Sequence, residues 1–187
     1  MSWIEEVDLE DQNLPGIFRV MSLNPGALAL VKGLNEELAF GGSGLTRIQE
    51  EAIATVVSTA NKCRYGALTH GGCLRRQAHD SQLASDLLHD FYQADLSDAD
   101  RAMLDFALKL TLQSSSVVSD DLEGLREAGF EDQAILSIVL TTCLFNFMNR
   151  LADGLGIDVP REYQKAVRKW LTGPAAEQEW LLQPKGE

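Results

Sequence analysis

Basic residues are scarce in this 187-residue sequence. Its 16 Lys and Arg are outnumbered by 28 Asp and Glu, which gives a formal net charge of -12 at pH 7. Proteins that bind nucleic acid or an anionic membrane surface do so largely through positive charge on phosphate groups. The charge balance therefore argues against both kinds of partner.

Cysteine is also rare, with only three residues, Cys63, Cys73 and Cys143. An odd number at irregular spacing does not match the framework of a disulfide-stapled secreted domain. The first residues are acidic, where a signal peptide needs a basic segment followed by an apolar one. We therefore expect a cytoplasmic protein.

Long hydrophobic runs are missing as well. The most apolar run, residues 134–148, is shorter than the roughly 20 residues that a membrane helix needs, and it contains Thr141, Thr142 and Asn146. We expect this run to form a buried helix, with Cys143 as a small core residue.

Signals for β-strands are almost absent, whereas helix signals recur along the chain. Asn24-Pro25 starts a first helix that ends at a glycine-rich loop over 41–44, and Thr46 starts a second in a capping-box arrangement with Gln49. Further helices are predicted from about residue 61 past 70, over 81–92, 97–113, 119–128 and 132–152, and from 158 onward. The predicted fold class is all-α.

This pattern predicts one core domain over residues 45–173. Residues 1–44 would form an N-terminal extension and a first helix that packs on the core. Residues 174–187, which include two prolines among polar residues, are expected to be a loosely held tail.

Chemically interesting residues gather between positions 50 and 70, where a carboxylate, a thiol and an imidazole follow one another. Cys63 lies at an expected helix N-terminus, where unpaired N–H groups, helped by Lys62 and Arg64, would favour its thiolate. Cys63 is therefore a candidate nucleophile. The alternative is a half-buried structural cysteine.

His70 follows Cys63 by two helical turns, roughly 10 Å along the axis at 1.5 Å per residue, so the two side chains cannot bond directly. One turn before His70 stands Gly66, which leaves a gap that a water or a substrate could fill. Tyr65 could add a hydroxyl donor to this pocket, or could simply pack there. The plainer alternative is that Gly66 only permits close helix packing and that His70 is solvated or satisfied in the core.

Other candidate sites are weaker. His79 lies nine residues after His70, and His89 lies ten residues after His79, so no two of these imidazoles share a helix face, and we expect no metal. The loop at 41–44 lacks the Gly-Lys-Ser/Thr ending of a phosphate-binding loop. We therefore expect neither a nucleotide nor another cofactor.

A polar group formed by Asn146, Asn149 and Arg150 lies on the otherwise apolar helix near the C-terminus. A charge so close to a buried segment needs a partner, either Asp153 or a residue across a subunit interface. We interpret this group as structural.

The order of Glu51, Cys63 and His70 resembles the motif of the AhpD-like alkylhydroperoxidases in the carboxymuconolactone decarboxylase superfamily. That motif is a Glu, eleven residues, then Cys-x-x-Cys-x-x-x-His. A second stretch, Phe-Asn-Phe-Met-Asn-Arg-Leu-Ala-Asp-Gly-Leu-Gly over residues 145–156, is similar to the signature of the peroxidase-related proteins in this family. The resemblance extends over residues 23–158 and implies an AhpD-like helical bundle that forms a homo-oligomer.

In catalytic members of this family, the two motif cysteines cycle between dithiol and disulfide while the Glu and His pass protons. Here Gly66 occupies the second cysteine position, so the local disulfide cannot form. Cys73 is about 15 Å from Cys63 along a continuous helix, beyond the roughly 7 Å Cα separation that a disulfide tolerates. It cannot replace the missing cysteine unless the helix breaks at Gly71-Gly72.

Two interpretations follow from the resemblance. In the first, the protein is a thiol-dependent hydroperoxide reductase: the Cys63 thiolate attacks the O–O bond and becomes a sulfenic acid, which an external thiol or reductant protein resolves, while His70 and Glu51 manage protons. In the second, the redox cycle is lost. The domain then binds a small molecule, serves in assembly, or acts as an acid/base decarboxylase-like enzyme in which His70 transfers a proton.

Overall fold

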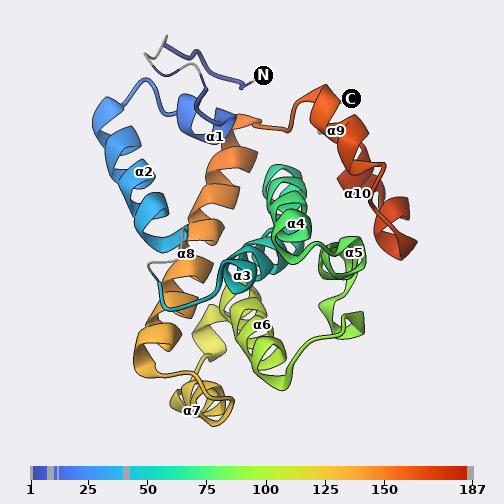
Figure 1. Ribbon diagram of the computed structural model, residues 1–187. Helices are drawn as coiled ribbons and strands as arrows, with labels where there is room; N and C mark the ends of the chain where they lie inside the picture. The colour runs from blue at the N-terminus through green and yellow to red at the C-terminus, as the bar shows by residue number, and fades with distance from the viewer. Residues whose placement is uncertain (1, 8–10, 12, 40–42, 185–187) are drawn as a thin grey trace.

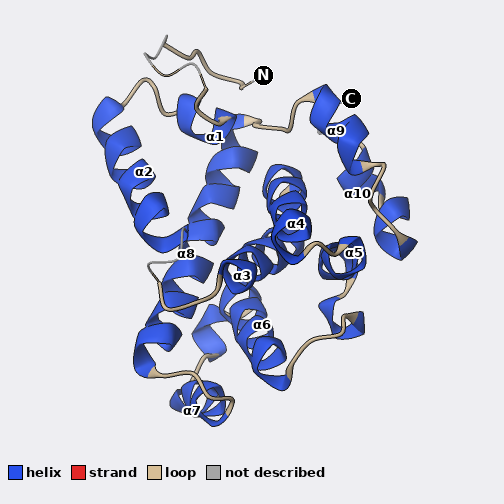
Figure 2. Cartoon of the chain, viewed as in Figure 1, coloured by secondary structure: helices blue, strands red, loops and turns tan. Residues whose placement is uncertain are grey.

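The computed structural model describes the chain except residues 1, 8–10, 12, 40–42 and 185–187. The described part contains ten α-helices, three 3-10 helices and no strand, so the expected all-α class is confirmed (Figures 1 and 2). The α-helices are α1 (Gly16–Arg19), α2 (Pro25–Ala39), α3 (Arg47–Ala60), α4 (Arg64–Ala78), α5 (Ser81–His89), α6 (Asp98–Leu112), α7 (Ser119–Glu127), α8 (Asp132–Leu155), α9 (Arg161–Val167) and α10 (Glu179–Leu182). The 3-10 helices are η1 (Phe91–Gln93), η2 (Ser114–Ser116) and η3 (Gly173–Glu177).

Helix α3 lies at the centre of the bundle, where α4, α6 and α8 pack around it (Figure 1). The predicted capping box fixes its start: the Gln49 N–H donates to Thr46 Oγ1 at 3.2 Å, and the Thr46 N–H donates to Gln49 Oε1 at 2.9 Å. Every residue from 50 to 58 is buried, including the carboxylates of Glu50 and Glu51. Buried carboxylates require polar partners, so this segment is where a site is to be sought.

Helix α4 begins directly after Cys63, which is its N-cap, and continues to its end without a break. Gly71-Gly72, where a break would have been needed to bring Cys73 to Cys63, is helical, and the lack of side chains there allows a close approach of neighbouring groups. A Cβ on Gly72 would lie only 2.0 Å from the hydroxyl oxygen of Tyr163 in α9. Cys63 and Cys73 therefore stay at different heights along one continuous helix, and no disulfide joins any of the three cysteines.

Helix α8 is the longest of the described helices and packs against α2, α3 and α6. By length and composition it could cross a membrane, but half of its most apolar window is buried inside the bundle, as in a core helix. The opposite face exposes a stripe at helical spacing that consists of Leu136, Leu140, Cys143 and Phe147. The expectation that Cys143 is a core residue is therefore wrong, because this position falls on the outer face.

The described N-terminal and C-terminal segments both pack on the central helices. In the N-terminal part, α1 and α2 pack against α8. At the C-terminus, Ala175 and Leu181 are buried, and Nε of Arg64 donates to the Leu181 carbonyl at 2.8 Å. The described part of the expected loose tail is thus held against the core, because its apolar side chains have a surface to cover. Residues 185–187, like part of the loop at 41–44, lie outside the described chain.

Candidate functional site

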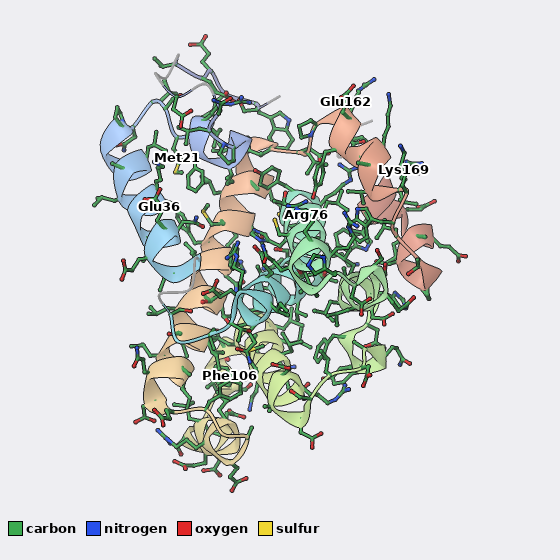
Figure 3. The ribbon with its side chains drawn as sticks, in the orientation of Figure 1. Met21, Glu36, Arg76, Phe106, Glu162 and Lys169 are labelled. Carbon is green, nitrogen blue, oxygen red and sulfur yellow. The ribbon has the colours of Figure 1, made fainter. Side chains whose placement is uncertain are left out.

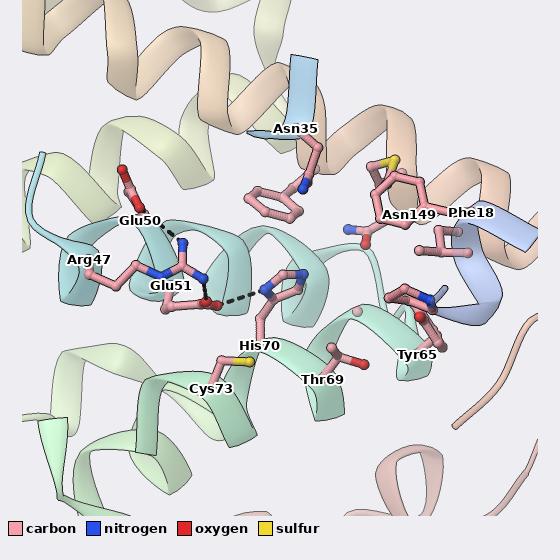
Figure 4. Close-up of a pocket in the computed structure, with 15 residues that line it drawn as sticks. Phe18, Asn35, Arg47, Glu50, Glu51, Tyr65, Thr69, His70, Cys73 and Asn149 are labelled. Atoms are coloured by element: carbon pink, nitrogen blue, oxygen red, sulfur yellow. Dashed lines mark hydrogen bonds and ion pairs between the residues drawn. The ribbon is translucent and has the colours of Figure 1, made fainter. Parts of the chain in front are cut away.

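A cavity of about 270 Å³ lies among α3, α4 and α8, with α1 and α2 contributing to its wall (Figure 4). Its apolar wall includes Ile17, Phe18, Phe145 and Met148. The polar or ionisable residues that line it are Asn35, Arg47, Glu50, Glu51, Tyr65, Thr69, His70, Cys73 and Asn149. A mostly apolar cavity with a few converging polar groups is the usual form of a small-molecule site.

Glu51 and His70 meet at this cavity. Oε2 of Glu51, on α3, lies 2.7 Å from Nδ1 of His70, on α4. The carboxylate is only 2% exposed, and the imidazole packs edge-on against Phe145 with 4.4 Å between ring centroids. A carboxylate that accepts from Nδ1–H fixes the tautomer and leaves Nε2 as the proton acceptor. Figure 4 shows the second ring nitrogen of His70 turned away from Glu51 and toward the cavity.

Arg47 holds the two buried carboxylates of α3 from the preceding turn. Its guanidinium donates to Oε2 of Glu50 at 3.0 Å and also pairs with Oε1 of Glu51. Ser43 completes the cluster by donating to Oε1 of Glu50 at 2.7 Å. Sequence reasoning missed Arg47, although its spacing of three and four residues from the two carboxylates was a usable signal for one helix face.

Cys63 does not join this group. It is 0% exposed and does not line the cavity, and its Sγ lies 3.7 Å from the Asn149 carbonyl oxygen. Arg64, which was expected to favour the thiolate, instead pairs with Asp158 and the Leu181 carbonyl. The structure thus brings two of the three motif residues together at the cavity and leaves the third in the core.

Gly66 lines the cavity, and its lack of a side chain is required there. A Cβ on this residue would lie 2.4 Å from Oδ1 of Asn149 and 2.5 Å from Oγ of Ser58. The Ser58 hydroxyl donates to Oδ1 of Asn149 at 3.0 Å, so these two side chains fill the space beside Gly66. Tyr65 also lines the cavity, and burial raises the pKa of its hydroxyl, which stays protonated at neutral pH.

Cys73, rather than Cys63, is the cysteine that lines the cavity. Its sulfur accepts a hydrogen bond at 3.0 Å from Arg76, which lies one turn further along α4 (Figure 3). Burial raises the pKa of the Cys73 thiol, and the nearby carboxylate of Glu51 raises it further. The group at the cavity is therefore a neutral thiol at pH 7. Its position three residues after His70, on the same helix face, was the sequence signal for this placement.

Asn149 has a position that sequence reasoning did not anticipate. It is 2% exposed, lines the cavity, and has no hydrogen-bond partner for Nδ2 among the described residues. Arg150, by contrast, is exposed and donates to the backbone and side-chain oxygens of Asn146, each at 2.8 Å. Only Asn149 of this polar group faces the cavity.

Metal ligands do not gather in the part of the chain that is described, where no three His, Cys, Asp or Glu side chains could hold an ion together. The polar side chains that line the cavity can donate and accept hydrogen bonds.

Solved structures share this fold. An uncharacterised peroxidase-related protein from Silicibacter sp. TM1040 is 35% identical, with 80% of this chain and 78% of that one covered at a TM-score of 0.77. An alkylhydroperoxidase AhpD core protein from Ralstonia eutropha JMP134, also peroxidase-related, is 32% identical, with 80% and 79% covered at a TM-score of 0.76. The debrominase Bmp8 with 2,3,4-tribromopyrrole has the same fold at 18% identity, with 85% and 83% covered and a TM-score of 0.72. No protein-family model and no curated protein matches this chain.

Proposed function

This chain belongs to the AhpD-like family of peroxidase-related proteins, and we propose that it is an enzyme that transfers a proton to or from a small, largely apolar molecule through His70. The observation that carries this proposal is the 2.7 Å contact between Nδ1 of His70 and Oε2 of Glu51 in an apolar cavity. Cys63 has no part in that cavity.

The geometry suits general acid/base catalysis. Glu51 holds the Nδ1 proton, so the lone pair of Nε2 is available to a substrate in the cavity. When Nε2 takes a proton, the carboxylate stabilises the resulting imidazolium, as in other carboxylate–imidazole pairs. Arg47 engages the other oxygen of Glu51 and so keeps Oε2 directed at the ring. A positioned base of this kind contributes about 10²- to 10⁴-fold to a rate.

Thiol-dependent reduction of a hydroperoxide is the activity expected from the resemblance, and it fits these contacts less well. The O–O bond must reach a thiolate, but Cys63 is fully buried. Cys73 is accessible from the cavity, yet its raised pKa disfavours the thiolate. The same fold is found in a debrominase, so the fold does not fix the reaction.

One experiment separates the two activities. Purified protein is incubated in D₂O with small molecules that carry an acidic C–H bond, and hydrogen exchange is followed by NMR. In parallel, consumption of cumene hydroperoxide is followed in the presence of dithiothreitol. Both assays are run on the wild type and on the variants His70→Gln, Glu51→Gln and Cys63→Ser.

The proposal predicts exchange that drops by about 10²-fold or more in His70→Gln. Exchange also falls in Glu51→Gln and is unchanged in Cys63→Ser. Hydroperoxide consumption that disappears in Cys63→Ser, without any exchange activity, would instead establish the single-cysteine peroxidase. If neither reaction occurs, the domain is a binding or assembly module.

A further inference from the structure

The side-chain amide of Asn149 is a buried donor without a partner. Its Oδ1 is occupied by the Ser58 hydroxyl at 3.0 Å, whereas Nδ2 has no hydrogen-bond partner among the described residues. The side chain is 2% exposed, so bulk water does not solvate it. Nearly all buried donors in folded proteins are paired, and an unpaired one at a cavity points to a ligand or an ordered water.

This donor is aimed at the cavity. Asn149 lines it from α8, opposite His70 on α4. Figure 4 shows the amide nitrogen of Asn149 turned toward the space that the second nitrogen of His70 also faces. The amide cannot easily turn away, because the Ser58 hydroxyl holds Oδ1 and the backbone of Gly66 lies directly beside it.

The net charge of the residues that line the cavity indicates which kind of hydrogen-bond acceptor a ligand can present to Asn149. Its lining residues include two buried carboxylates, those of Glu50 and Glu51, and one guanidinium, that of Arg47. The lining therefore has an excess of one negative charge while His70 is neutral. A carboxylate or phosphate ligand would be repelled in this apolar site, whereas a neutral oxygen acceptor would not.

We propose that the cavity binds a neutral carbonyl compound on an apolar frame, with its oxygen accepting a hydrogen bond from Nδ2 of Asn149. This inference rests on the proposed acid/base function of His70 and adds the substrate class and the residue that anchors it. The aromatic and aliphatic side chains of Phe18, Phe145 and Met148 then contact the frame.

Nε2 of His70 and Nδ2 of Asn149 together could remove a proton from the carbon next to the carbonyl of the ligand. Nε2 of His70 takes the proton from the adjacent carbon, the C–H electron pair forms a C=C bond, and the carbonyl π pair moves to the oxygen. The product is an enolate, whose oxygen accepts more strongly from Nδ2 of Asn149 than the carbonyl does. Return of the proton from the imidazolium regenerates the ketone, so the step requires no oxidant, reductant or second substrate.

The test compares two ligands of the same shape. Acetophenone carries a carbonyl oxygen where α-methylstyrene carries a CH₂ group, so their difference in affinity reports a hydrogen bond to oxygen. Dissociation constants are measured by NMR titration of the full chain, and the side-chain amide signal of Asn149 is followed directly. Benzoate serves as the anionic probe.

Wild-type protein should bind acetophenone at least tenfold more tightly than α-methylstyrene and should not bind benzoate. The Asn149 amide proton signals should shift on addition of acetophenone alone. In Asn149→Asp, which keeps an acceptor for Ser58 but removes the donor, the preference should vanish. Asn35→Asp makes the same change at the other amide that lines the cavity and should leave the preference in place.

Equal affinities for the two ligands, or no binding of acetophenone, would overturn the proposal even if every Asn149 variant failed to fold. A preference that survives in Asn149→Asp and leaves the amide signals unmoved would overturn the assignment to this residue. Failure of the proposed function looks different. In that case acetophenone is still preferred, but its methyl protons exchange with D₂O at the same rate in wild type and in His70→Gln.

Discussion

Gly66 and Asn149 approach so closely that a Cβ on residue 66 would lie 2.4 Å from Oδ1 of the amide. The position of the second motif cysteine is therefore filled from the neighbouring helix by Asn149, with Ser58 beside it. A side chain at this position must displace a buried hydrogen-bonded pair. Glycine at this position is thus required by the arrangement of Ser58 and Asn149.

Restoring a side chain at position 66 should destabilise the protein. We expect Gly66→Ala and Gly66→Cys to lower the free energy of unfolding by about 1–3 kcal/mol, as overpacking does. Urea denaturation measures this change. The matched control is Gly33→Ala on α2, where a Cβ meets nothing within 4 Å, so that the added helix propensity should be neutral or stabilising. Equal changes in the free energy of unfolding at both positions would show that crowding against Asn149 does not destabilise the variants.

The stability of the protein should depend on Arg47, which pairs with both Glu50 and Glu51. Replacing it in Arg47→Met leaves the carboxylates of Glu50 and Glu51 buried without their shared guanidinium. Because the Arg47 side chain is partly exposed, we expect a loss of about 2 kcal/mol, below the roughly 3–5 kcal/mol typical of fully buried pairs. Lys32→Met, which breaks the exposed pair with Glu36, is the control and should change stability by less than about 0.5 kcal/mol.

The three cysteines should react with a thiol reagent in the order of their exposure to solvent. Exposed Cys143 should react first with 5,5′-dithiobis(2-nitrobenzoate). Cys73 should react more slowly at pH 7, because its raised pKa keeps the thiol protonated, and its rate should increase as pH rises above 8. Buried Cys63 should react only on unfolding. Rapid labelling that persists in Cys143→Ser at pH 7 would contradict this order, and mass analysis would identify the residue concerned.

Local sequence signals predicted the longer helices well, because helix starts and ends depend on neighbouring residues, but they missed the short helices α1 and α10. The capping box of Thr46 and Gln49 is a case in which a few adjacent residues decide the conformation. The faces of the helices were harder to predict. Periodicity places Cys143 on one face of α8, but only the packing of other helices decides that this face is exposed.

The site was predictable only in part for the same reason. The resemblance placed Glu51, Cys63 and His70 in one group, and the structure shows that helix packing joins the first and third at 2.7 Å. The burial of Cys63 and the unpaired Nδ2 of Asn149 depend on α8, where Asn149 lies 86 residues beyond Cys63. No spacing rule within the motif carries that information.

The tyrosines should all titrate above their ordinary range. Burial raises the pKa of Tyr65 and Tyr163, and a hydrogen bond to the Asp105 carboxylate raises the pKa of Tyr92 to about 12. Absorbance of the folded protein at 295 nm should therefore show no tyrosinate forming with a pKa near 10.

These shifts also make stability depend on alkaline pH. An unfolded tyrosine releases its proton near pH 10, whereas folded Tyr92 keeps it until about pH 12. The free energy of unfolding should therefore be insensitive to these groups below pH 10 and should fall as pH rises from about 10 to 12. Asp105→Asn should weaken this slope and return the Tyr92 titration toward 10. An unchanged titration in that variant would exclude the carboxylate as the cause.

The C-terminal segment should contribute to stability through Leu181. Leu181 lies in α10 and is only 1% exposed, and its own backbone carbonyl accepts a hydrogen bond from Arg64. Truncation in Leu181→Ala removes a fully buried side chain, so we expect a loss of about 2–5 kcal/mol in the free energy of unfolding. Leu30→Ala on α2 is the matched control, because Leu30 is 77% exposed and its truncation should cost less than about 0.5 kcal/mol. If both variants unfold at the wild-type urea concentration, α10 does not stabilise the core. A large effect of Leu181→Ala alone would show that the last helix is an integral part of the bundle, since only a docked segment can lose that much burial energy.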